Sequence, residues 1–240
     1  MNKKTLGFFF LLLLFISTIT AQDTNVHSLM QTALVKDSTE NYAEALKALD
    51  KALELSQHHN DTALWLHSKV SLENNDIKTA TKDINEVINH AHNYSEAYFI
   101  RGTIKAKIED YEGAIKDFSK VIELNPNSYL AYYNRGLAYA LGNEITQAMQ
   151  DFSRTIELNP TYSKAYFNRG YWKDLMGDIE GALVDLIKAK DLNPKDKEIY
   201  LELAVVYARN KKMKEACQEL ENAVVAGHSI SEELKSEFCK

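Results

Sequence analysis

An all-α fold built from repeated helix pairs is predicted by three features of this 240-residue sequence. The segments AYFIRG, AYYNRG and AYFNRG recur at intervals of 34 residues. The three prolines of the chain keep the same interval, and each closes a similar ending: Pro126, Pro160 and Pro194. Between these markers, apolar residues recur at three- and four-residue steps, the period of a helix face. A fixed period of this length indicates one supersecondary unit repeated along the chain.

Each unit is predicted to contain two helices joined by a short turn. The third unit begins with SEAYFIRGTIKAKI, turns at EDY, and continues with EGAIKDFSKVIEL before NPN. Proline cannot continue a helix and disfavours helix at the residue before it, so NPN ends the unit.

The repeat frame extends to six units, near residues 26–60, 61–94, 95–128, 129–162, 163–196 and 197–228. Small residues keep step in the central units: Gly102, Gly136 and Gly170 in the first helices, and Ala114, Ala148 and Ala182 in the second. We expect these pairs to mark the points where two helices cross too closely for a large side chain. The first, second and sixth units lack the glycine and the proline and are degenerate copies.

This pattern resembles the tetratricopeptide repeat, and the resemblance covers about residues 24–230. It is most specific in the three central units, which carry the glycine, the alanine and the closing proline. One hairpin cannot bury its own apolar face, so neighbouring hairpins must stack. The resemblance implies a right-handed α-solenoid in which the first helices line a concave face and the second helices form a convex face.

The first 21 residues have the layout of a secretory signal peptide: basic MNKK, the apolar run LGFFFLLLLFI, and STITA. The apolar run is shorter than the roughly 20 residues that span a bilayer. An uncleaved membrane anchor is the alternative. Cleavage after Ala21 would leave residues 22–240 as the solenoid. We therefore expect an exported protein, periplasmic or extracellular, with no membrane insertion after signal cleavage.

The charge of the remaining chain bears on its partners. Residues 22–240 contain 26 basic and 34 acidic residues, a net charge of −8. Such a surface is a poor match for nucleic acid, whose backbone attracts basic patches. Protein partners are expected instead.

An arginine and an aspartate recur together in the three central units. One position of the first helix holds Arg101, Arg135 and Arg169, and one position of the second holds Asp117, Asp151 and Asp185. Because the arginine adjoins the close glycine contact, we predict an Arg–Asp pair inside each central hairpin, bidentate where geometry permits. Exposed, unpaired charges are the alternative. Such a pair would be structural and says nothing about ligands.

The C-terminal residues are predicted to cover the last hairpin. Gly227 can end the preceding helix, and Ser229 with Glu232 has the spacing of a capping box. The side chains of Ile230, Leu234 and Phe238 then share one face. We expect a capping helix within residues 229–240.

The two cysteines, Cys217 and Cys239, are each about ten residues from this turn. An even cysteine count in an exported protein favours a disulfide, which would join the cap to the last hairpin. The bond closes a loop of about 23 residues, for which chain entropy predicts roughly 3 kcal/mol. A buried free Cys217 is the alternative.

Motifs of enzymatic chemistry are not found in the sequence: it has no CxxC, no phosphate-binding glycine loop, no G-x-S-x-G and no H-E-x-x-H. We expect a protein that is not an enzyme and binds no cofactor. Four histidines follow the second helices of the first two units: His58, His59, His90 and His92. They would suit a transition metal if they converged. The simpler interpretation is that they replace the missing prolines, and no metal site is predicted.

The concave face carries the main functional clue. The resemblance implies that the fifth residue of each unit points inward: Met30, Trp65, Phe99, Tyr133, Phe167 and Leu201. Tyr171 and Leu137 lie one or two turns further along, and Asn134 and Asn168 stand beside the stripe. Equivalent asparagines in some members of the family hold the backbone of an extended peptide. Aromatic rings would supply contact area and the amides would fix register. Packing of the same rings on neighbouring hairpins is the alternative.

The sequence thus predicts a protein–protein interaction module that binds a peptide segment or helix of a partner in its concave groove. The predicted binding residues are Trp65, Phe99, Tyr133, Asn134, Phe167, Asn168 and Tyr171. The alternative is a scaffolding or assembly subunit of a cell-envelope complex, bound through its convex face or its ends.

Overall fold

The computed structural model describes residues 23–57 and 60–239 of the chain. Over those residues the secondary structure is helical, without a strand. The predicted signal peptide, residues 1–21, and the pair His58–His59 lie outside the described residues. Among the helices described, none has the length and apolar character needed to cross a bilayer.

The chain divides into two compact units, one ending at Lys120 and the other beginning at Val121. In the first, a helix over residues 23–38 is followed by five helices: α2 (Tyr42–Leu55), α3 (Asp61–Glu73), α4 (Ile77–His90), α5 (Ser95–Lys107) and α6 (Tyr111–Leu124). The last four residues of α6 lie past the division.

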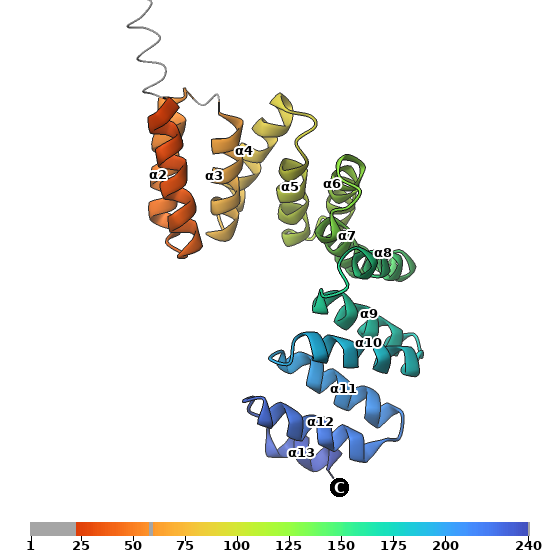
Figure 1. Ribbon diagram of the computed structural model, residues 1–240. Coiled ribbons are helices and arrows are strands. Elements are labelled where there is room, and N and C mark those ends of the chain that lie inside the picture. The colour runs from red at the N-terminus through yellow and green to blue at the C-terminus, as the bar shows by residue number, and fades with distance from the viewer. Residues whose placement is uncertain (1–22, 58–59, 240) are drawn as a thin grey trace, which may run out of the picture. The chain divides into compact units, whose positions relative to one another are not determined.

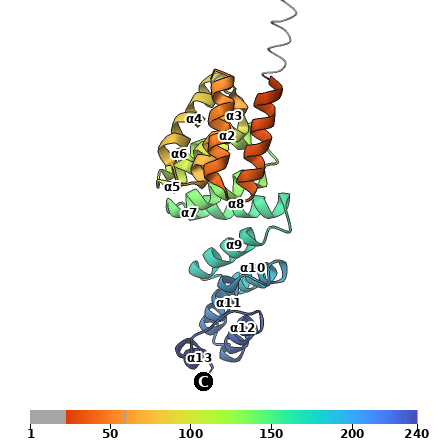
Figure 2. The same ribbon diagram turned by 90° about the vertical axis from the view of Figure 1, so that its left-hand side faces the viewer.

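The second unit also consists of successive helices. Its helices are α7 (Tyr129–Leu141), α8 (Ile145–Leu158), α9 (Ser163–Leu175), α10 (Ile179–Leu192), α11 (Lys197–Arg209), α12 (Met213–Val225) and α13 (Glu232–Phe238). Consecutive helices pack as hairpins, so that α9 lies beside α10 and α11 beside α12 (Figures 1 and 2). This is the packing of tetratricopeptide solenoids, and the fold class is all-α.

Local sequence explains where the helices begin. The side chains of Asn60, Asp76 and Asp178 each accept a hydrogen bond from a backbone N–H in the first turn of the helix that follows. These N–H groups have no partner inside the helix, so a short polar side chain stabilises the helix start by about 1 kcal/mol.

The turn inside each hairpin places one residue in the left-handed region. The residues are Glu40, Asn75, Glu109, Asn143, Gly177 and Lys211, with φ between 58° and 86°. Only Gly177 among them is free of the Cβ that disfavours this region. The other turns hold residues in a conformation that glycine adopts more readily.

The glycine positions are close crossings. A Cβ built on Gly102 would lie 2.9 Å from the ring of Phe118, and one on Gly136 would lie 2.9 Å from Phe152. On Gly170 it would lie 2.9 Å from Leu186. The partner alanines Ala114, Ala148 and Ala182 are fully buried. Small residues therefore let each central hairpin close on a large apolar side chain.

Candidate functional site

Each central hairpin contains an Arg–Asp pair across the two helices, at what we call the seam. Arg101 Nε and Nη2 donate to the two carboxylate oxygens of Asp117 at 2.9 and 2.8 Å. Arg135 and Asp151 repeat this geometry at 2.8 and 2.9 Å. The third seam is equally bidentate: Arg169 Nε and Nη2 donate to the carboxylate oxygens of Asp185 at 2.8 and 2.7 Å.

The three aspartates of the seams are almost fully buried, so their charges depend on these partners. Lys105 adds a second cation to Asp117 at 2.7 Å, and Lys173 adds one to Asp185 at 2.8 Å. The seams therefore stabilise the hairpins and leave no charge free for a ligand.

The second hairpin of the chain, α3–α4, has a seam that the sequence interpretation missed. His67 occupies the arginine position and Asp83 the aspartate position, each 34 residues before Arg101 and Asp117. His67 Nδ1 lies 2.6 Å from Asp83 Oδ2, and Nε2 lies 3.3 Å from Asp50 Oδ1 on α2. Counting back 34 residues from Arg101 and Asp117, whatever the residue type, would have identified His67 and Asp83 as a pair.

The charge of His67 is favoured by its surroundings. Burial alone lowers the pKa of this imidazole, but the hydrogen bond and charge of Asp83, together with Asp50, outweigh burial and raise the pKa. With a carboxylate at each ring nitrogen, the imidazolium is the form that satisfies both. This seam is therefore held by a cation that can lose its proton.

The last hairpin replaces the seam by a contact between hairpins. Leu203 takes the arginine position and is buried. Glu219 takes the aspartate position, and its carboxylate accepts from Lys190 of α10 at 2.7 Å. The acidic position thus keeps a cationic partner even where the arginine is lost.

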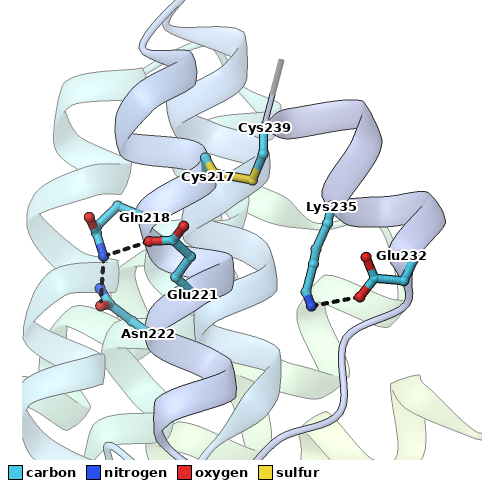
Figure 3. Close-up of a disulfide and its surroundings, with 7 residues drawn as sticks. All are labelled: Cys217, Gln218, Glu221, Asn222, Glu232, Lys235 and Cys239. Atoms are coloured by element: carbon cyan, nitrogen blue, oxygen red, sulfur yellow. Dashed lines mark hydrogen bonds and ion pairs between the residues drawn. A yellow bond between two sulfur atoms is a disulfide. The ribbon is translucent and has the colours of Figure 1, made fainter.

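A disulfide joins α12 to the end of α13 (Figure 3). The Cα atoms of Cys217 and Cys239 are 4.9 Å apart, within the range that a disulfide bridges. The capping helix is shorter than predicted, because it begins at Glu232 rather than near residue 229. Its cap is Ser231, whose side chain accepts from the N–H of Leu234, and Ser229 is not the cap.

Two of the predicted binding residues are engaged in the core of the first unit. Trp65 is partly buried and packs against both apolar clusters of that unit. Phe99 meets the ring of Phe118 edge-on, with centroids 5.6 Å apart. Both rings stabilise the packing of their own unit.

Tyr133 is also a core residue. Its side chain is 9% exposed, and its ring meets those of Phe152 and Tyr162. Burial raises the pKa of its hydroxyl to about 12. Asn134 next to it donates its amide N–H to the Leu130 carbonyl of its own helix at 2.7 Å.

The remaining three predicted binding residues meet at a hollow that we call the α9–α11 groove. It has a volume of about 380 Å³. From α9 it is lined by Phe167, Asn168 and Tyr171, and from α11 by Glu198, Leu201, Glu202 and Val205. Of these, Leu201 also belongs to the predicted inward stripe, whereas Val205 and the two glutamates were not singled out from the sequence.

The polar groups of the groove differ in how they are satisfied. Asn168 donates to the Lys164 carbonyl of its own helix at 2.9 Å and to the Tyr133 hydroxyl at 3.1 Å. Burial raises the pKa of Glu202, and the charge of Asp174 raises it further, while Arg209 lowers it. The groove thus combines apolar side chains with one partly buried carboxylate, that of Glu202, and one exposed carboxylate, that of Glu198.

No metal centre is found in the described part of the chain, where no group of three or more His, Cys, Asp or Glu could hold an ion. His90 Nδ1 lies 2.9 Å from Asp61, and His92 Nδ1 lies 2.7 Å from the Ile88 carbonyl oxygen. Both histidines therefore have local partners in their own hairpin.

Comparison with known proteins begins with family models. A "TPR repeat" model matches residues 102–142, and "Tetratricopeptide repeat" models match residues 129–162 and 26–59. No curated protein matches the sequence.

Solved structures resemble the chain more widely. The pilF protein of Pseudomonas aeruginosa has a TM-score of 0.77 at 16% identity, covering 91% of this chain and 98% of its own. A tetratricopeptide repeat protein of Parabacteroides merdae has a TM-score of 0.66 at 20% identity, covering 90% of this chain and 85% of its own.

A third structure, YrrB, is described as a TPR protein with an unusual peptide-binding site. It has a TM-score of 0.58 at 24% identity and covers 75% of this chain and 92% of its own. At these identities the likeness concerns the fold alone. The three model matches identify tetratricopeptide repeats over residues 26–59 and 102–162, and the hairpins described above have the packing of this repeat.

Proposed function

We propose that the protein is a non-catalytic interaction module whose α9–α11 groove binds a segment of a partner protein. Tetratricopeptide repeats generally mediate contacts between proteins. The observation that carries the proposal is the groove, where Phe167, Tyr171 and Leu201 meet beside the amide of Asn168. Apolar side chains with a few polar groups are typical of sites that bind ligands.

The position of the groove distinguishes its rings from those of the rest of the predicted stripe. Tyr133 is enclosed by its neighbours, whereas Phe167 and Tyr171 are only partly covered and line open space. Binding would cover these rings, and burying apolar area is favourable by about 25 cal/mol per Å².

A binding experiment tests this function. Peptides are selected from a random display library on the purified protein, and their affinities are measured by fluorescence anisotropy. Tyr171→Ala is expected to weaken binding about tenfold, as is common for a central aromatic contact. Unchanged affinity for this variant, with an unchanged helical circular-dichroism spectrum, would refute the groove proposal.

A second candidate function is assembly through the convex side. A hollow of about 590 Å³ lies along α8 and includes Met149, Ser153 and Met176, of which Met176 is 64% exposed. Met149 and Met176 line the same hollow, and apolar side chains gathered on a surface favour a protein contact. Met176→Ala serves as the matched variant: loss of binding there, with Tyr171→Ala unaffected, would favour scaffolding.

We also propose that the protein is exported and works in the periplasm or outside the cell, with its signal peptide removed. The support is the layout of residues 1–21 and the disulfide, because such bonds persist in oxidising compartments. Expression of the full chain in a bacterial host, followed by sequencing of the mature N-terminus, tests this. Gln22 is expected as the first residue, and a retained Met1 would contradict cleavage.

A further inference from the structure

Glu202 stands at a position that its counterparts fill with an amide. Asn134, Asn168 and Glu202 follow one another at 34-residue intervals, at the same point of α7, α9 and α11. Each asparagine donates its N–H to the carbonyl four residues earlier in its own helix. A carboxylate has no hydrogen to donate, so Glu202 cannot make this bond.

Within the described part of the chain, Glu202 has neither a hydrogen bond nor an ion pair. It is nevertheless only partly exposed and lines the groove. The carboxylate therefore lacks both full hydration and a protein partner, a condition that a buried charge ordinarily avoids.

The cation whose charge acts on Glu202 is already engaged: Arg209 pairs with Asp174. Asp174 itself is 4% exposed, and its Oδ1 has no hydrogen-bond partner. This end of the groove consequently carries more negative charge than its own side chains neutralise.

The apolar lining of the groove indicates which kind of cation would suit it. Leu201 and Val205 lie on the same helix as Glu202, and Phe167 faces them from α9. Lysine and arginine have apolar stems that pack on such side chains while the charged head reaches a carboxylate. A basic side chain therefore matches both parts of the surface.

We infer that the α9–α11 groove binds a partner segment through a lysine or arginine whose cation pairs with Glu202, next to an apolar residue of the segment. The inference rests on the proposed function, since it names the chemistry of the partner for the same groove. Glu198, at the exposed edge of the groove, favours the approach of a basic segment from solution.

A double-mutant cycle tests the inference with peptides selected from a random display library on the purified protein. The selected peptides are expected to be enriched in lysine or arginine beside an apolar residue. For the tightest lysine peptide, Glu202→Gln is expected to weaken binding about tenfold, because it removes one charge-assisted hydrogen bond. Replacing that lysine by norleucine should weaken binding as much, and combining both changes should add little.

Controls separate this inference from the proposed function. Glu237→Gln removes an exposed charge of α13 outside the groove and should leave affinity unchanged. If Tyr171→Ala weakens binding while Glu202→Gln and norleucine act independently or have no effect, the groove is used and the basic contact is refuted. If no selected peptide depends on Tyr171 or Glu202, both proposals are refuted.

Discussion

The seams of the hairpins α3–α4 and α7–α8 pair a buried aspartate with different cations. In α3–α4 of the first unit His67 faces Asp83, whereas in α7–α8 of the second unit Arg135 faces Asp151. Arginine stays charged at every accessible pH, and a histidine changes charge near neutrality. The difference teaches that the repeat requires a cation beside its buried aspartate but does not require a permanent one.

The residue that follows the seam cation also differs between these hairpins. Ser68 stands at the glycine position of the α3–α4 hairpin, and its hydroxyl donates to the Ala80 carbonyl at 2.8 Å. Ile84 stands where α6 has Phe118 and α8 has Phe152. Compared with the glycine and phenylalanine of the α5–α6 and α7–α8 hairpins, α3 thus has a larger side chain, Ser68, and α4 a smaller one, Ile84.

The largest effect is expected from removing the aspartate of an arginine seam. Asp151→Ala removes the bidentate carboxylate partner of a largely buried guanidinium and should lower the free energy of unfolding by about 3 kcal/mol, measured by urea denaturation. Asp83→Ala at pH 8 should cost only about 1 kcal/mol, because His67 can become neutral. Equal losses at the two sites would contradict the comparison.

A matched control accompanies this measurement. Arg135→Met combined with Asp151→Leu removes both charges together and should restore most of the lost stability. If the double variant is as unstable as Asp151→Ala, the loss arises from packing and not from the broken Arg135–Asp151 ion pair.

The disulfide is a difference of a second kind, because the described residues of the first unit contain no cysteine. Replacing Cys217 and Cys239 by alanine should lower the stability of the second unit by roughly 3 kcal/mol. Hydrogen exchange should show lost protection in α12 and α13 and unchanged protection in α3 and α4. Equal loss in both units would mean that they unfold together.

The stability that the His67–Asp83 seam contributes should depend on pH. The pKa of His67 is raised in the folded state, so its stabilising contribution is complete below the unfolded pKa and disappears as pH rises through the folded pKa. The wild type should therefore lose stability on going from mildly acid to mildly alkaline pH. His67→Gln should reduce this loss in urea titrations at several pH values, and an unchanged pH profile would refute the assignment.

The smallest effect is expected in the turns. Gly177→Ala should lower stability by about 1 kcal/mol through its positive φ alone, since nothing lies within 4 Å of the added Cβ. Glu109→Gly, at the same point of the first unit, should raise stability by about 0.5 kcal/mol. Thermal unfolding measures both, and a destabilised Glu109→Gly would show that this side chain contributes more than its strain.

Much of the fold follows from local signals in the sequence. α7, α9 and α11 begin 34 residues apart, each after a segment that contains the repeated proline, and Gly136 marks the crossing of α7 with α8. These signals act over a few residues or between adjacent helices, so a periodic sequence displays them directly.

The α13 helix and the groove show where local signals end. Ser229 and Ser231 have similar capping chemistry, and the choice of Ser231 depends on how Phe238 reaches the core. Tyr133 and Phe167 occupy the same position, yet only Tyr133 is enclosed, because Tyr162 packs over it. Such outcomes depend on neighbours distant in sequence, which a repeat pattern does not specify.

The bidentate hydrogen bonding of each seam arginine also affects how the helices can move relative to one another. Arg169 holds both oxygens of Asp185 within its own hairpin, but reaches the preceding hairpin only through one bond, 3.1 Å long, to the Ser153 hydroxyl. Rotating one helix of this pair about its partner would break both bonds of the arginine at once, whereas tilting the pair on the preceding hairpin would strain only one of its bonds. Between α9–α10 and α11–α12, where the α9–α11 groove opens, the ion pairs Arg209–Asp174 and Lys190–Glu219 join the two hairpins instead. A bound segment would therefore meet a groove whose two walls are already held together by charged contacts.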